Sequence, residues 1–156
     1  MPTQPTSPGV ATGSIAAAAT TGALVAIGHR LGSVALPFAS IGAALVHRTV
    51  SAGNASLVIV GLVLHVTSAF LWSIAFVFLV RRARLRDVVA AIVIAVSELL
   101  ASRVVTFSTG GGVANVLQLG DQIVLALVYA LSLVVGMRFA FPLSRNARSG
   151  SDVSRM

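Results

Sequence analysis

The sequence predicts an all-α fold, a polytopic transmembrane helical bundle of four spans with a short interfacial or re-entrant segment. Hydrophobic residues make up 56% of the chain and charged residues only 10%, whereas soluble domains carry about 25% charged residues. Residues 55–80 contain one ionisable side chain, His65, and the arginine-rich stretch 81–86 follows at once. At about 1.5 Å per residue the apolar run covers about 39 Å, more than the roughly 30 Å hydrocarbon core of a bilayer.

The first predicted span, residues 10–28, is rich in alanine, threonine and glycine. Ala18, Gly22 and Ala26 recur at intervals of four, which places small residues on one helix face. Because such a face allows helices to approach closely in lipid, we expect it to pack against another helix. The preceding residues 1–9 are polar and proline-containing, and we expect them to be disordered.

Residues 31–46 form an apolar segment that is short for a span. Pro37 lies inside it, and a proline in a helix interior removes a hydrogen bond and breaks the helix. We therefore predict an interfacial or re-entrant segment. The alternative is that this segment crosses the bilayer, which gives five spans.

The third and fourth spans are predicted at residues 88–105 and 121–141. Asp87 suits the N-cap of the third span, because a carboxylate can accept hydrogen bonds from the first turn. Residues 106–118 read as a glycine-rich loop, and residues 142–156 as a polar, basic tail.

The distribution of arginine predicts the orientation. The net charge of +7 comes from arginine alone; four arginines lie in residues 81–86 and three in the tail, against Arg30, Arg48 and Arg103 on the opposite side. Basic residues stay in the cytoplasm, so we expect the 81–86 loop and the C-terminus there. Arginine at the ends of apolar runs does not indicate nucleic-acid binding. The arginine, alanine and glycine usage is typical of a GC-rich bacterial genome, and we expect the bacterial inner membrane.

Several functional classes find no support in the sequence. The absence of cysteine excludes disulfides, thiolate metal sites and covalent haem attachment. The glycines at 110–112 lack the Lys-Ser/Thr of a phosphate-binding loop, and no nucleophile elbow or zinc-protease motif occurs. We expect a non-enzymatic protein with no catalytic residues, no metal site and no evident soluble small-molecule substrate.

Three polar side chains are predicted at one depth in the bilayer. His65, Glu98 and Tyr129 each lie eight or nine residues from the same predicted end of their spans, which is about 12–14 Å. An ionisable group at this depth costs about 2.5–3.5 kcal/mol on insertion scales. The three could bond to one another and hold the bundle together, His65 and Glu98 could handle protons or ions, or His65 could ligate a haem or chlorophyll-type pigment.

Arg103 and Asp121 bracket the glycine-rich loop between the third and fourth spans. Opposite charges at the two ends of a short connection can approach each other. We therefore predict an interfacial ion pair between them.

Four stretches follow one another along the chain: Pro37-Phe38, Ile-Gly-Ala-Ala at 41–44, GLVLHVTSAFLWSIAFVFLVRR from Gly61, and the closing GMRFAFPLSR. In this order they resemble small, uncharacterised four-helix bacterial inner-membrane proteins of the YagU-like type. The resemblance implies a four-helix fold and no defined chemistry. The sequence departs from the family at the start of the last helix, where Asp121 and Gln122 stand in place of a histidine.

The leading functional hypothesis is an accessory or structural subunit that packs against a larger respiratory or photosynthetic membrane complex. Its partners would be membrane lipids and other membrane-protein subunits. One alternative is a small homo-oligomeric transporter or proton-handling protein using His65 and Glu98. Another is a haem or chlorophyll-type pigment protein using His65, although the sequence requires no cofactor.

Overall fold

The computed structural model describes residues 8–109 and 112–140 and shows an all-helical protein, as predicted. The helices are α1 (Pro8–Arg30), α2 (Leu36–Val46), α3 (Ala55–Arg81), α4 (Asp87–Thr109), α5 (Val113–Val116) and α6 (Leu119–Ala140). Four of them, α1, α3, α4 and α6, are long and apolar enough to cross a bilayer. The chain is therefore a multi-pass membrane protein.

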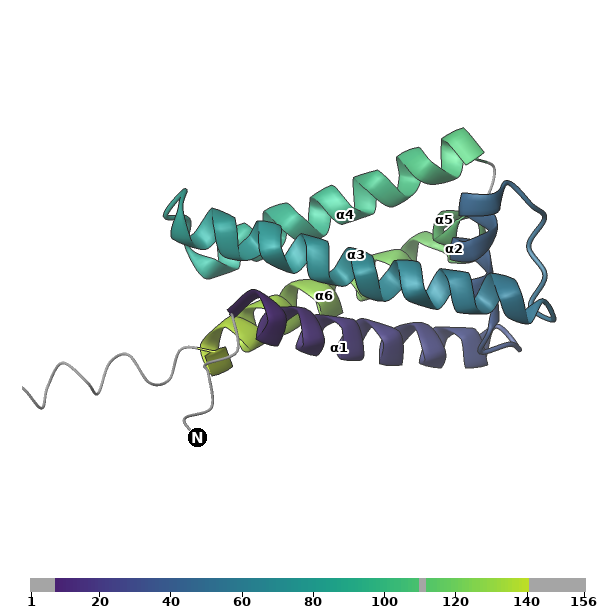
Figure 1. Ribbon diagram of the computed structural model, residues 1–156, viewed down its shortest axis with the longest axis horizontal. Helices are drawn as coiled ribbons and strands as arrows, with labels where there is room; N and C mark the ends of the chain where they lie inside the picture. Colours follow the sequence, from purple (N-terminus) through teal and green to yellow (C-terminus); the bar gives the residue numbers. More distant parts are fainter. Residues whose placement is uncertain (1–7, 110–111, 141–156) are drawn as a thin grey trace, which may run out of the picture.

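The four long helices alternate in direction (Figure 1). The start of α1, the α3–α4 connection and the end of α6 lie at one end of the bundle, which we call the arginine end. The short helices α2 and α5 lie at the other end, which we call the cap end. Because α2 begins and ends at the cap end, it adds no further crossing. The structure thus has four candidate spans among its described residues.

The α2 helix shows how a proline can begin a helix. Pro37 lies in the first turn, where its missing N–H has no partner to lose. Residues 31–35 are not helical and the helix begins at Leu36, so the apolar segment 31–46 is broken next to Pro37, as predicted. The helix stops at His47, whose backbone is left-handed (φ 50°) and whose N–H donates to the carbonyl of Ala43.

The α2 and α3 helices cross with their backbones in contact. A Cβ atom added at Gly42 would overlap the carbonyl oxygen of Leu57, and one at Gly61 would overlap that of Phe38. Only glycine permits this approach. At the start of α3, the side chain of Asn54 caps the helix by accepting from the N–H groups of Ser56 and Leu57. The glycine contacts hold the cap end of α3 against α2, and the Asn54 cap fixes where α3 begins.

The packing of α1 differs from the sequence prediction. Its buried face includes Thr12, Ala16, Thr20 and Leu24, which recur at intervals of four. The predicted stripe of Ala18, Gly22 and Ala26 is exposed, and a Cβ at Gly22 would meet nothing within 4 Å. The buried face packs against α3 and α6. Every face of α1 carries small residues, so small size alone did not identify the face that packs.

The helix ends also differ from the predicted boundaries. The α4 helix continues to Thr109 through part of the predicted 106–118 loop, and α5 adds one turn within it. Residues 8 and 9 belong to α1, whereas the rest of the predicted disordered N-terminus, residue 141 of the fourth span and the basic tail lie outside the described residues. At the arginine end, Asp87 accepts from the N–H of Val88, and its carboxylate lies 3.7 Å from Arg138 of α6.

Candidate functional site

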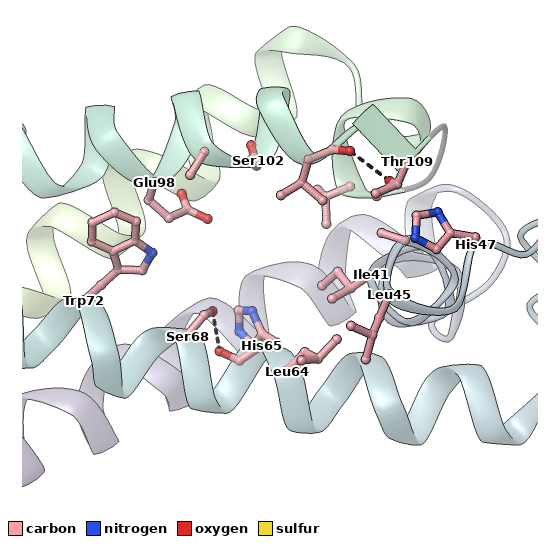
Figure 2. A pocket seen from close by; sticks show the side chains of 15 residues that line it. Ile41, Leu45, His47, Leu64, His65, Ser68, Trp72, Glu98, Ser102 and Thr109 are labelled. Carbon is pink, nitrogen blue, oxygen red and sulfur yellow. Dashed lines mark hydrogen bonds between the residues drawn. The ribbon is translucent and has the colours of Figure 1, made fainter. Parts of the chain in front are cut away.

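A cavity of about 420 Å³ lies between α3 and α4. The α2 and α5 helices form its wall at the cap end (Figure 2). This volume falls within the range of about 300–1,000 Å³ that is usual for small-molecule sites. Its lining residues are Ile41, Ala44, Leu45, His47, Leu64, His65, Ser68, Trp72, Glu98, Ala101, Ser102, Val105, Thr109, Gly112 and Val113.

Glu98 contributes the acidic group of this cavity. It lies on the face of α4 that also carries Ala91, Ala95 and Ser102, as the spacing predicts. Ala91 and Ala95 are buried in the bundle, and farther along the same face Glu98 and Ser102 line the cavity. Figure 2 shows the Glu98 side chain pointing into the space between α3 and α4. The carboxylate therefore faces the cavity between these two helices.

His65 lines the same cavity from α3. Its side chain also contacts α1, on the side of the ring away from the cavity. Its Nε2 atom lies 3.0 Å from the hydroxyl of Thr20. That hydroxyl has one hydrogen, and at 2.7 Å it donates it to the carbonyl of Ala16. With the Thr20 hydrogen on Ala16, this hydrogen-bond network assigns Nε2–H as the donor to Thr20, and the lone pair of neutral His65 then lies on Nδ1. Among the residues described, none forms a hydrogen bond with Nδ1.

Two serine hydroxyls beside these groups also use their hydrogens on the backbone. Ser68 donates to the carbonyl of His65 at 2.9 Å, and Ser102 donates to the carbonyl of Leu99 at 2.8 Å. A carbonyl oxygen can only accept, so each serine oxygen is left with acceptor capacity alone. The polar part of the cavity is thus rich in hydrogen-bond acceptors.

The rest of the lining consists of Trp72, aliphatic side chains, and the polar side chains of His47 and Thr109 near the cap end. Trp72 lies two turns along α3 from His65, and Figure 2 shows it beside Glu98. Leu45, Leu64 and Val105 are among the apolar residues nearer the cap end. The cavity therefore combines a polar centre with an apolar wall, an arrangement typical of ligand sites.

Tyr129 lies apart from the other two residues of the predicted cluster. It is 4% exposed, belongs to the core between α1, α3, α4 and α6, and does not line the cavity. Its hydroxyl donates to the carbonyl of Ala69 at 3.1 Å, a carbonyl that also accepts from Ser73 at 2.7 Å. The structure thus brings His65 and Glu98 to one cavity and places Tyr129 in the core.

The structure gives Asp121 a partner other than Arg103. Arg30, at the end of α1, forms the ion pair with Asp121, at the start of α6. Arg103 is exposed and lies in a surface hollow beside Thr106 and Phe107. The end of α1 and the start of α6 meet at the cap end. Asp121 therefore pairs with Arg30, its neighbour in space, and not with Arg103, which precedes it in the chain.

The surroundings of His65 also bear on the pigment hypothesis. Gly61, one turn away, could have left room for a macrocycle, but the backbone of α2 at Phe38 and Gly42 fills that space. The Phe38 ring meets the His65 ring edge-on, with centroids 6.2 Å apart. Any ligand of His65 must therefore bind on the side of the ring that faces the cavity.

Thr20, Ser68 and Trp72 complete the site but were not assigned to it by the sequence. Thr20 lies ten residues before Arg30, a depth of about 15 Å that is close to the depth predicted for His65. Counting the depth of hydroxyl residues as well as ionisable ones would have identified Thr20. Ser68 and Trp72 lie three and seven residues after His65, a spacing that places both on the same helix face as the histidine.

No family model, curated protein or solved structure matches the chain. The four apolar helices agree with the fold that the YagU-like resemblance implies. Function must therefore be argued from the cavity itself.

Proposed function

We propose that the protein is a non-enzymatic membrane transporter or proton-handling protein whose polar site is formed by His65 and Glu98. One observation carries the proposal: both side chains line a single cavity between α3 and α4. An ionisable side chain costs about 2.5–3.5 kcal/mol at the centre of a bilayer and typically marks a pathway for protons or ions. A cavity provides the space such a pathway needs, which a purely structural His–Glu contact would not.

His65 and Glu98 can together bind a proton or a cation. Glu98 supplies a negative charge when ionised, and Nδ1 of His65 supplies a neutral acceptor. Thr20 keeps Nε2–H occupied and so orients the histidine ring. A proton or a cation entering the cavity therefore meets two acceptors supplied by helices from opposite walls.

Proton flux into proteoliposomes tests this function. We expect wild-type protein to acidify the lumen under an imposed potential, as measured by a trapped pH-sensitive dye. Glu98→Gln keeps the side-chain shape but removes the charge, and should abolish the flux while leaving the melting temperature unchanged. Asp87→Asn, at the arginine end and outside the cavity, is the matched control and should retain it. Equal flux with Glu98→Gln would contradict the proposal.

We place the protein in a bacterial inner membrane with the arginine end in the cytoplasm. Arginine clustering supports this orientation, and the arginine loop lies at the same end as the start of α1 and the end of α6. The chain has no cysteine, so single cysteines can report the side of each end. An impermeant maleimide should label His47→Cys in intact spheroplasts and Arg84→Cys only after permeabilisation. The reverse pattern would invert the orientation.

The accessory-subunit hypothesis keeps one specific observation in its favour. An apolar groove of about 210 Å³ lies between α4 and α6 and includes the small side chains of Ala95, Ala126 and Ala130. Small residues allow a transmembrane helix of a partner subunit to pack closely. Native-gel migration from digitonin-solubilised membranes tests this: a large complex supports it, and a monomer or small homo-oligomer contradicts it. A visible absorbance band lost in His65→Ala would instead identify a haem or chlorophyll-type pigment.

A further inference from the structure

The cavity between α3 and α4 has a marked chemical bias in its polar groups. Glu98 accepts hydrogen bonds when ionised, and Nδ1 is the acceptor that His65 retains because Nε2–H is bonded to Thr20. Ser68 and Ser102 have already donated their hydrogens to helix carbonyls. Four neighbouring groups from two helices therefore offer lone pairs to a ligand, and the indole N–H of Trp72 is a donor beside them.

The charges of the lining residues also favour a cation over an anion. Among the described residues that line it there is no arginine, and Glu98 is the one acidic side chain. His47 is exposed at the cap end, away from the Glu98 carboxylate in Figure 2. An anion would therefore meet one carboxylate and three further acceptors, whereas a cation with N–H groups would donate to all four.

The remaining lining fits the apolar part of such a cation. The Trp72 ring lies beside Glu98, and indole is the aromatic ring that attracts cations most strongly. Ile41, Leu45, Leu64 and Val105 line the part of the cavity nearer α2 and α5. These aliphatic side chains can cover a short hydrocarbon group that carries the charge.

We propose that this cavity binds a lipophilic organic monocation of the primary-ammonium class, with the ammonium between Glu98 and His65 and the hydrocarbon toward α2. This inference rests on the proposed function, because it names the solute that the His65 and Glu98 site receives. The ammonium donates to the Glu98 carboxylate, to Nδ1 of His65 and to the serine oxygens.

The single tryptophan of the chain makes the proposal directly testable. Trp72 fluorescence would be recorded for full-length protein in nanodiscs of zwitterionic lipid during titration with hexylammonium, hexanol or hexanoate. These probes share a hydrocarbon chain and differ in charge. We expect saturable quenching or shift by hexylammonium alone. Saturation by hexanol or hexanoate at equal concentration would overturn the proposal.

Two variants and one control locate the site. Glu98→Gln should weaken hexylammonium binding at least about tenfold, because a charged hydrogen bond is lost. Ser102→Ala should weaken it about fivefold by removing one neutral acceptor, and remains informative if Glu98→Gln does not fold. Asp87→Asn should bind as the wild type does. Unchanged affinity in both cavity variants would overturn the proposal.

The binding and flux experiments can fail separately. If hexylammonium does not bind but proton flux persists and needs Glu98, the solute class is wrong and the proposed function stands. If hexylammonium binds at Glu98 but neither protons nor hexylammonium cross the membrane, the site stands and the transport proposal fails. Hexyltrimethylammonium, which has no N–H, should bind more weakly than hexylammonium if the acceptors select the ligand.

Discussion

The α3 helix meets α2 and α4 in opposite ways. Toward α2 it presents Gly61, and the two backbones touch with no room for a methyl group. Toward α4 it presents His65, Ser68 and Trp72, and a cavity of about 420 Å³ remains. Both interfaces lie in apolar helices of similar composition. The comparison shows that side-chain size at a few positions determines whether two helices pack in contact or leave a space between them.

The largest expected effect comes from enlarging the closed interface. Gly61→Leu places a side chain against the carbonyl of Phe38, where even a Cβ would overlap. Because backbone cannot move aside as a flexible side chain can, we expect a loss of more than about 3 kcal/mol of stability, or failure to fold. Thermal unfolding in detergent measures this loss. The matched control is Gly22→Leu, at an exposed position with nothing within 4 Å, which should fold normally. Equal destabilisation by both would contradict the crossing.

A smaller effect is expected at Thr20, whose hydroxyl bonds to His65 at the cavity between α3 and α4. Thr20→Val keeps the side-chain shape but removes the partner of His65 Nε2. Hydrogen bonds between membrane helices average about 0.6 kcal/mol, so we expect a stability loss of that size. Nitrogen NMR of labelled His65 should also show loss of the Nε2–H preference. Retention of one tautomer in Thr20→Val would mean that another group orients the ring.

The smallest effect is expected at the cap end. The Arg30 side chain is 56% exposed and that of Asp121 is 15% exposed, so the ion pair is partly screened by solvent. Arg30→Gln should cost no more than about 0.5 kcal/mol. Arg103→Gln should cost nothing measurable, because Arg103 lies elsewhere on the surface. A larger loss for Arg103→Gln than for Arg30→Gln would restore the pair predicted from the sequence.

The sequence predicted the features that depend on composition and length. Apolar runs of about the length needed to cross a bilayer identified all four long helices. Counting residues from the ends of two neighbouring spans placed His65 and Glu98 at one depth, and the structure finds both at one cavity. Depth is predictable because the rise per residue in a helix is constant.

Helix rotation and long-range pairing could not be predicted in the same way. The small residues of α1 occur on all its faces, so Gly22 could not be distinguished from the residues that do pack. Tyr129 has the predicted depth but points into the core. Arg103 is close to Asp121 in sequence, yet Arg30 is its partner because α1 and α6 end side by side. These features depend on which helices are neighbours, and hydropathy does not report that.

The contact between Gly42 and Gly61 also orders the steps of biogenesis. The α2 helix has 11 residues, too few to cross the bilayer alone. The backbone surface that receives it belongs to α3, which leaves the ribosome afterwards. During synthesis α2 must therefore wait at one side of the membrane until the chain has been made beyond Gly61. Only then can α2 dock, so this end of the bundle is completed after the start of α3 has been made.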